Sequence, residues 1–244
     1  MPDVSIIFYL LLFVVAFLYS SVGHGGASGY LALMALFSMP VAFMKSSSLL
    51  LNICVSLVAF VLFYRNVEFP WKLFIILTLV SIPCAFIGGM ITTNSSHYKH
   101  ILGALLLVPA VRFTGIFPEK SILKRKISIP IALIIGAIIG LLSSMIGIGG
   151  GILLSPLLIL LGWATTKESS AVSALFIFLN SIAAVLGMHS RGVVFESNIF
   201  LFASIAVAGG LLGAYYGSKH RNPITLKRLL SAVLLIASIK LIFT

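Results

Sequence analysis

The sequence predicts an all-α polytopic membrane protein built from two inverted repeats, each a glycine-broken hairpin followed by three transmembrane helices. The chain of 244 residues is 60% hydrophobic and only 9% charged. The few charged residues separate long uncharged runs, and the two longest runs each carry a glycine cluster near the middle. Because soluble domains usually contain about 25% charged residues, this composition excludes a water-soluble globule.

The charge and cysteine content narrow the class further. The formal net charge is +11, which on a soluble chain would suggest a nucleic-acid partner. Here the basic residues lie between apolar runs, so they favour a cytoplasmic membrane surface, and we expect no nucleic acid as partner. Two cysteines cannot hold together a disulfide scaffold of this length.

The first half begins with an uncharged run over residues 4–44, about twice the 20 residues that one helical span needs. The cluster Gly23-His24-Gly25-Gly26 interrupts it. We expect single spans to follow within residues 46–64, 73–98 and 100–117. These segments are continuously apolar without alternation, which predicts helices rather than a β-barrel. No basic region or cleavage site of a signal peptide is evident, so we expect the first helix to be retained.

The second half repeats this order. The run over residues 127–166 is again about twice a span, and the cluster Gly147-Ile148-Gly149-Gly150-Gly151 interrupts it. Single spans are expected within residues 169–190, 197–218 and 229–244. Each long run is predicted to form a hairpin; whether it is re-entrant or crosses the membrane twice stays open at this point.

The two halves share short matches in the same order, which indicates a duplication. Gly25-Gly26 aligns with Gly149-Gly150, and Arg65 with Arg191, at a nearly constant spacing. Chance similarity between apolar helices is the alternative. We therefore divide the chain into a first transmembrane repeat, a basic linker and a second transmembrane repeat, at residues 1–118, 119–126 and 127–244.

The distribution of basic residues predicts the orientation. If the linker is cytoplasmic, most of the 16 basic residues also face the cytoplasm. The loops at Lys45 and Lys99 and both termini then lie on the periplasmic side. The matched residues Arg65 and Arg191 fall on opposite faces, so the halves are inverted. Inverted repeats are typical of secondary transporters, whose sites lie near the bilayer midplane between the halves.

The glycine clusters are candidates for an anion site. A helix that starts after a glycine turn has backbone N–H groups without intrahelical partners, and these attract anions. Nearby serines supply hydroxyl donors. The residues expected to bind substrate at the tips are Ser20, Ser21, Gly23, Gly25, Gly26, Ser28, Ser143, Ser144, Gly147, Gly149, Gly150 and Gly151. The alternative is that the glycines only permit a tight turn and close helix packing.

Further polar residues lie within the apolar runs and are candidates by default. His24, inside the first cluster, is a candidate proton site, or a histidine at an aqueous hairpin tip. Asn52 and Asn180 follow the hairpins and either line the site or bond between helices. We expect Arg112 to extend toward the linker, with contact to an anion as the alternative, and Lys45 to anchor a helix at the membrane interface, with gating as the alternative.

Enzymatic chemistry finds no support in the sequence. The five acidic residues lie at predicted loops or helix ends. Neither glycine cluster is completed by the lysine of a nucleotide-binding loop, and the histidines and cysteines lack metal-ligand spacing. We therefore expect a protein that is not an enzyme and that holds neither a metal nor another cofactor.

The two clusters, as Ser20-Ser21-Val22-Gly23-His24-Gly25-Gly26 and Ser143-Ser144-Met145-Ile146-Gly147-Ile148-Gly149-Gly150-Gly151, resemble the repeated glycine motif of the TauE/SafE family of sulfite exporters. The second cluster is the closer match, because Ala27 stands where the first would have a third glycine. The resemblance covers the whole chain. It implies a transporter of a bacterial inner membrane that exports sulfite or an organosulfonate.

The expected function is thus secondary transport of a small anion by alternating access, with the site between the two tips near the midplane. The expected partners are this substrate, the lipid bilayer, a coupling proton or sodium ion, and a second copy of the chain in a homodimer. An anion channel of the same fold and a carrier for small carboxylates are the alternatives.

Overall fold

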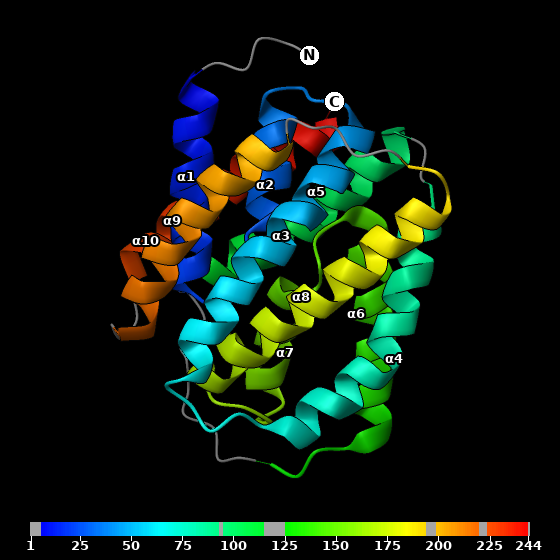
Figure 1. The fold of residues 1–244 in the computed structure, drawn as a ribbon, viewed down its shortest axis with the longest axis vertical. Coiled ribbons are helices and arrows are strands. Elements are labelled where there is room, and N and C mark those ends of the chain that lie inside the picture. The colour runs from blue at the N-terminus through cyan, green and yellow to red at the C-terminus, as the bar shows by residue number, and fades with distance from the viewer. Residues whose placement is uncertain (1–5, 93–94, 115–124, 194–198, 220–223, 244) are drawn as a thin grey trace.

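The computed structural model describes residues 6–92, 95–114, 125–193, 199–219 and 224–243, and every regular element within them is a helix (Figure 1). The helices of the first half are α1 (Ile6–Ser21), α2 (Ala27–Leu36), α3 (Val41–Tyr64), α4 (Trp71–Met90) and α5 (Ser95–Phe113). Those of the second half are α6 (Ile129–Ile146), α7 (Gly151–Leu160), α8 (Thr166–Ser190), α9 (Ile199–Lys219) and α10 (Ile224–Phe243). The all-α prediction, with one hairpin and three further helices in each half, is confirmed.

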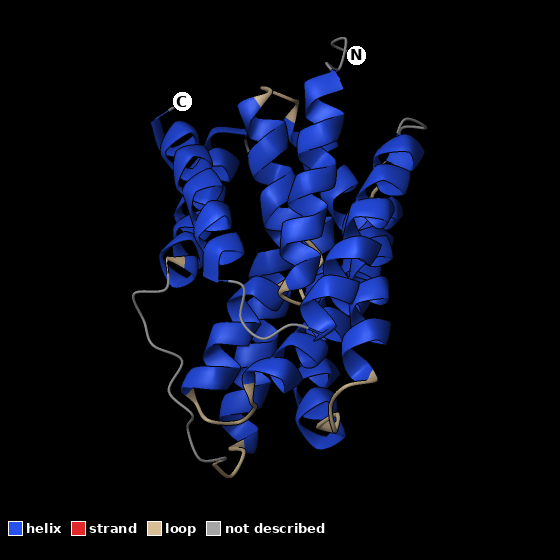
Figure 2. Cartoon of the chain, turned by 90° about the vertical axis from the view of Figure 1, so that its left-hand side faces the viewer, coloured by secondary structure: helices blue, strands red, loops and turns tan. Residues whose placement is uncertain are grey.

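Each hairpin has a short second arm. These arms, α2 and α7, have 10 residues each, which corresponds to a length of about 15 Å, half the hydrocarbon thickness of a bilayer. The glycine turns that precede these arms lie at mid-height of the helical body, where Figure 2 shows short loop segments surrounded by helices. Arms of this length are too short for a full crossing, which favours the re-entrant alternative over double crossings.

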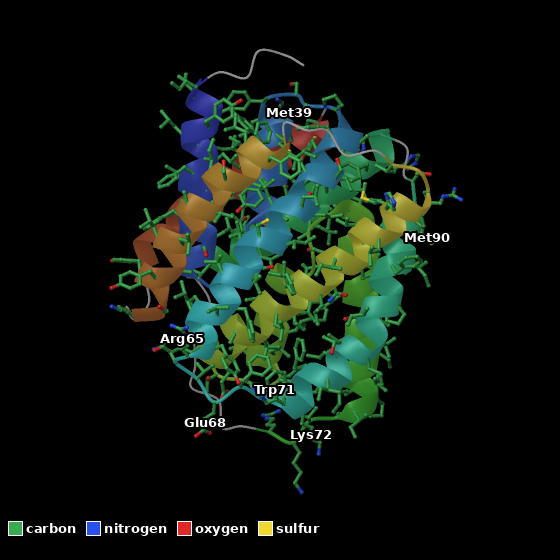
Figure 3. The ribbon with its side chains drawn as sticks, viewed as in Figure 1. Met39, Arg65, Glu68, Trp71, Lys72 and Met90 are labelled. Atoms are coloured by element: carbon green, nitrogen blue, oxygen red, sulfur yellow. The ribbon has the colours of Figure 1, made fainter. Side chains whose placement is uncertain are left out.

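The hairpins enter the helical body from opposite ends. In Figure 1, α1 descends from the upper end and α2 returns to it, whereas α6 ascends from the lower end and α7 returns there. Figure 3 marks the two ends of the molecule, with Met39 at the upper end and Arg65 at the lower end. The chain begins α1 and finishes α10 at the upper end (Figure 1).

The outer surface fits a lipid environment. The five helices α3, α4, α6, α8 and α9 are long and apolar enough to cross a membrane. Large apolar side chains on these helices face outward, for example Leu79 and Phe200 with 68% and 80% of their surface exposed. At the lower end, Tyr64 and Trp71 are exposed and form one aromatic group with Phe69, as expected at a membrane interface.

The principal helix contacts join one half of the chain to the other. Helix α4 packs on α6, α1 on α9, α3 on α8, and α5 on α10. Glycines bring the backbones together in two of these pairs: Gly140 of α6 approaches Ser81 of α4, and Gly213 of α9 approaches Phe17 of α1. Small residues of this kind allow close helix packing within membranes. The first arm of each hairpin therefore packs mainly against a helix of the opposite half, α1 on α9 and α6 on α4.

Two predictions fall on residues outside this description. Of the predicted basic linker 119–126, residues 119–124 are not described, and neither is the side chain of Arg112. Its expected extension toward the linker stays a prediction.

Candidate functional site

Both hairpin turns use glycine where the backbone requires it. Gly26 precedes α2 with a φ of 98°, and Gly150 precedes α7 with a φ of 84°. These left-handed conformations are accessible to glycine at little cost and are disfavoured for residues with a Cβ atom. Each turn thereby reverses the chain within about four residues and presents the first N–H groups of a short helix to the interior of the protein.

The side chain of Asn52 in α3 joins the two hairpin tips. Its Oδ1 accepts a hydrogen bond of 3.0 Å from the backbone N–H of Ala27, the first residue of α2. Its Nδ2 donates a hydrogen bond of 3.1 Å to the carbonyl oxygen of Ile148 in the second turn. Asn52 is fully buried. One amide group thus satisfies a donor of the first tip and an acceptor of the second.

Gly25 and Gly149 allow this approach because they lack a Cβ atom. A Cβ built on Gly25 would lie 2.5 Å from Oδ1 of Asn52, and one built on Gly149 would lie 2.6 Å from its Nδ2. Both positions also approach Cγ2 of Ile177 in α8, at 3.1 Å in each case. The two tips therefore contact the same pair of side chains, one from each half of the chain.

One serine holds each tip to a helix of the other half. The Ser170 hydroxyl in α8 donates a hydrogen bond of 3.1 Å to the carbonyl oxygen of Val22 in the first turn. The Ser48 hydroxyl in α3 is 2.9 Å from the carbonyl oxygen of Gly147 in the second turn and donates to it. The contacts are reciprocal: a backbone carbonyl of each tip accepts a hydrogen bond from a serine of the opposite half.

His24 connects the first tip to a chain of hydroxyl groups in the second half. Its Nδ1 lies 3.0 Å from the carbonyl oxygen of Val22, and its Nε2 lies 3.1 Å from Oγ of Ser155 in α7. Oγ of Ser155 lies 2.7 Å from Oγ of Ser173 in α8. Because a carbonyl only accepts, we assign the proton of the neutral ring to Nδ1. Ser155 then donates to Nε2, and Ser173 donates to Ser155.

The serines predicted to surround the tips fall into two groups. Ser20, Ser143 and Ser144 are fully buried, and their hydroxyls have no hydrogen-bond partner among the described residues. Ser21 and Ser28 have partners within the first hairpin: Ser21 donates to the carbonyl of Leu18, and Ser28 donates to Oη of Tyr19. The hydroxyls of the first group are thus the ones available to a ligand.

Asn52 and Asn180 occupy similar positions in the sequence, but their hydrogen bonds differ. Asn180 of α8 donates from Nδ2 to the carbonyl oxygen of Phe176 in its own helix at 2.8 Å, and its Oδ1 has no partner among the described residues. It does not link the tips as Asn52 does. Asn52 thus bonds between helices as well as to the second tip, whereas Asn180 bonds within its own helix; whether either lines a substrate site stays a prediction.

The expectation that Lys45 anchors a helix at the membrane interface is wrong. Lys45 is buried, with 8% of its surface exposed. Its ammonium donates hydrogen bonds to carbonyl oxygens at the end of α4, among them that of Ile91 at 3.0 Å. The last carbonyls of a helix lack intrahelical partners and carry partial negative charge, so a buried lysine is accommodated there.

The sequence reading missed several members of the site, which are Ser48, Ser155, Ser170, Ser173 and Ser181. Ser181 is fully buried, and its Oγ would lie 2.9 Å from a Cβ on Gly149. A signal for three of them was present, because a serine-rich segment opens the helix after each hairpin, at residues 46–48 and 169–173. Those segments supply Ser48, Ser170 and Ser173.

The arrangement has a direct chemical consequence for an anion. The first N–H of α2, which the sequence assigned to a bound anion, is occupied by Oδ1 of Asn52. An anion that binds there must displace this oxygen, which loosens one of the two hydrogen bonds joining the tips. Anion binding at this position and the Asn52 link between the tips therefore compete for the same N–H donor.

Comparison with known proteins places the chain among membrane transporters. The family described as "Sulfite exporter TauE/SafE" matches residues 8–241. A probable membrane transporter protein of Sinorhizobium fredii is 31% identical over 237 residues, covering 95% of each chain. A probable membrane transporter protein of Methanocaldococcus jannaschii is 26% identical over 221 residues, covering 85% of this chain and 81% of the relative. No solved structure gives a significant match.

Proposed function

The chain belongs to the sulfite exporter TauE/SafE family, and from this premise we propose that it is a secondary transporter that exports sulfite or an organosulfonate by alternating access. Family and relatives indicate a multi-pass membrane transporter rather than an enzyme. The finer proposal concerns the site, which lies between the two hairpin tips. Its setting is a bacterial inner membrane, with the linker cytoplasmic and both termini periplasmic.

Inverted repeats are part of this proposal. The hairpins enter from opposite ends (Figure 1), and the helix contacts form pairs when the halves are exchanged: α4 with α6 corresponds to α9 with α1. The boundaries of the repeats are those predicted from the sequence, residues 1–118 and 127–244. A site between two such repeats is exposed to alternate sides when one half moves against the other.

The bridge made by Asn52 is the observation that carries the proposal. Its amide joins Ala27 of one tip to Ile148 of the other in the interior of the protein. A substrate anion would take the place of the amide oxygen at the N–H of Ala27, and the buried hydroxyls of Ser20 and Ser143 would supply further donors. In the state with joined tips, the Asn52 amide bridges them. In the state with separated tips, the anion takes the place of the amide oxygen at the N–H of Ala27.

His24 gives this exchange a route for coupling to protons. A second proton on the ring makes Nε2 a donor, so the Ser155 hydroxyl has to turn and accept from it. Ser155 belongs to α7, and His24 belongs to the opposite tip. Protonation therefore changes a contact between the two hairpins, and imidazole is the side chain that titrates between pH 5 and 8.

The test is efflux of radiolabelled sulfite from proteoliposomes that contain the full chain. Asn52→Ala should lower the efflux rate at least tenfold, because it leaves the N–H of Ala27 and the carbonyl of Ile148 unpaired. Asn180→Ala is the matched control, since its amide bonds only within α8. Equal rates for the two variants, both folded, would contradict the proposed role of the bridge.

Electrical recordings separate the carrier from the alternative channel. A carrier that alternates between two states should give currents limited by its turnover, whereas single-channel openings in planar bilayers would assign the fold to an anion channel. Efflux of acetate or lactate at rates above that of sulfite would favour the carrier for small carboxylates.

A further inference from the structure

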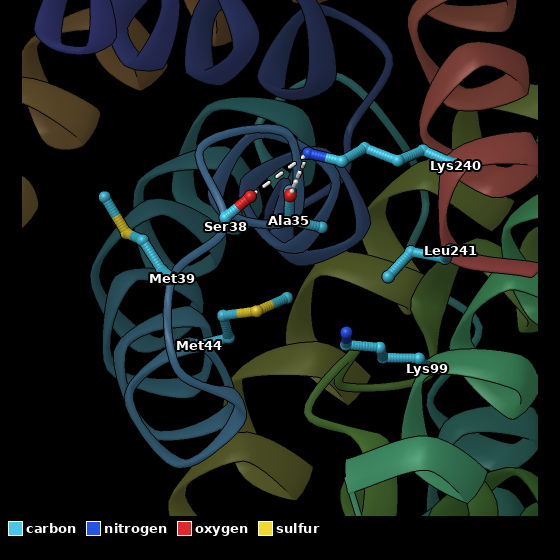
Figure 4. A pocket seen from close by; sticks show the side chains of 7 residues that line it. All are labelled: Ala35, Ser38, Met39, Met44, Lys99, Lys240 and Leu241. Atoms are coloured by element: carbon cyan, nitrogen blue, oxygen red, sulfur yellow. Dashed lines mark hydrogen bonds between the residues drawn. The ribbon is translucent and has the colours of Figure 1, made fainter. Parts of the chain in front are cut away.

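A pocket at the upper end of the molecule, away from the hairpin tips, has the chemistry of a second site. It has a volume of about 140 Å³ and lies where the end of α2, the start of α3, the start of α5 and the end of α10 meet (Figure 4). Its polar lining includes Lys99, Lys240 and Ser38. Its apolar lining includes Met39, Met44 and Leu241.

The two lysines of the pocket are engaged differently. The ammonium of Lys240 donates to the carbonyl oxygens of Ala35 and Leu36, at 3.0 and 2.8 Å, and to Oγ of Ser38 at 3.3 Å. It thereby caps the end of α2, where the helix dipole is negative. The ammonium of Lys99 has no hydrogen bond or ion pair within the described residues, and in Figure 4 it points toward Met44 and Leu241.

Among the residues that the structure describes, the carboxylates lie far from this pocket and its lysines supply the charge. The two acidic residues that the structure describes, Glu68 and Glu168, lie at the lower end: Figure 3 labels Glu68 there, and α8 begins there with Glu168 in its first turn. In a low-dielectric setting, an ammonium without a nearby counter-ion attracts an anion more strongly than it would in water. The Lys99 ammonium is therefore the natural first contact for an anionic group.

The apolar residues on the other side of the pocket determine which non-ionic part a ligand can have. Met39, Met44 and Leu241 are buried, with 8%, 2% and 3% of their surface exposed, so they offer an apolar wall rather than a hydrated one. Methionine side chains adapt to ligands of irregular shape. An anion without an apolar part would leave this wall unused, and a long chain would exceed the volume.

We propose that this pocket is a second anion site, in which Lys99 and Ser38 bind the head group of a small alkyl sulfonate or alkyl carboxylate and the methionine wall holds its short alkyl chain. The site is separate from the tips and does not depend on their role in transport. By the orientation proposed above it opens to the periplasmic side, where a soluble anion reaches it directly.

The test is calorimetric binding of ethanesulfonate to the full chain in nanodiscs of phosphatidylcholine. Lys99→Gln should weaken binding at least tenfold, and Lys99→Arg should retain it. Lys72→Gln is the matched control, because Lys72 is exposed at the opposite end. The neutral isostere ethyl methyl sulfone should not bind. Affinities of the native chain and Lys99→Gln within twofold of each other would overturn the proposal.

Two more measurements distinguish this pocket from the hairpin tips and from a lipid-binding site. In the Asn52→Ala background, ethanesulfonate binding that depends on Lys99 should persist even where sulfite efflux is lost, so the two sites succeed or fail independently. Replacing a third of the lipid with phosphatidylglycerol should leave the affinity unchanged. A tenfold loss in that lipid, absent from Lys99→Gln, would assign the pocket to a lipid head group and overturn the assignment to a soluble anion.

Discussion

Alanine at Gly25 tests the contact between the first tip and Asn52 without changing the conformation of the backbone. Among the tip glycines, Gly23, Gly26, Gly147, Gly149 and Gly150 have positive φ angles, whereas Gly25 does not. Its new Cβ would lie 2.5 Å from Oδ1 of Asn52, closer than real Cβ contacts, so the amide has to move. Overpacking of this kind costs about 1–3 kcal/mol, which corresponds to an equilibrium shift of about 5–150-fold.

The assay combines sulfite efflux from proteoliposomes with the melting temperature of the purified protein. Gly25→Ala should slow efflux by a factor in that range while the protein still folds. The cost should shrink in the Asn52→Ala background, because the amide that the Cβ meets is then absent, and a double-mutant cycle measures this difference. Gly192→Ala is a control that strains only the backbone, at a φ of 77°, since a Cβ there meets nothing within 4 Å. Native efflux by Gly25→Ala, or additive effects in the cycle, would refute the reasoning.

Two other predictions concern the tips. In His24→Gln, an imposed pH gradient should no longer accelerate efflux, because glutamine keeps a polar contact near Ser155 but does not titrate; acceleration equal to that of the native chain would exclude His24 as the proton site. In Gly26→Val and Gly150→Val, sulfite should no longer raise the melting temperature, because both positions have left-handed φ angles and a Cβ would meet Tyr30 or Ile139 at 2.6 and 2.8 Å. Thermal stabilisation by sulfite in both variants would leave the glycine clusters as packing devices only.

The helical composition and the two hairpins could be predicted from the sequence, because the signals for them are regular. Long uncharged runs and glycine clusters predict hairpins and spans, and the structure shows the hairpins with second arms, α2 and α7, too short to cross a bilayer. The partners of single side chains were not predictable in this way. Asn52 and Asn180 occupy similar places after each hairpin, and only the packing of α3 on α8 decides which one reaches both tips.

The same limit explains the misreading of Lys45 and the omission of Ser155. A lysine at the end of an apolar run is typical of the membrane interface, but here the last carbonyls of α4 accept its hydrogen bonds inside the protein. Ser155 lies in an apolar segment without a recognisable motif, and its role depends on His24, which is far away in sequence. Contacts between the two halves join residues far apart in the sequence, so local sequence patterns cannot predict them.

The central claim is that two glycine-tipped hairpins enter the membrane from opposite sides and meet at Asn52. The most direct measurement is the sidedness of single cysteines, in a chain whose Cys54 and Cys84 are replaced by alanine. Ser38→Cys lies at the outer end of the first hairpin and Thr166→Cys just after the second, and both positions are exposed. A membrane-impermeant maleimide should modify Ser38→Cys from the periplasmic side only and Thr166→Cys from the cytoplasmic side only. Modification of both cysteines from the same side would contradict the account.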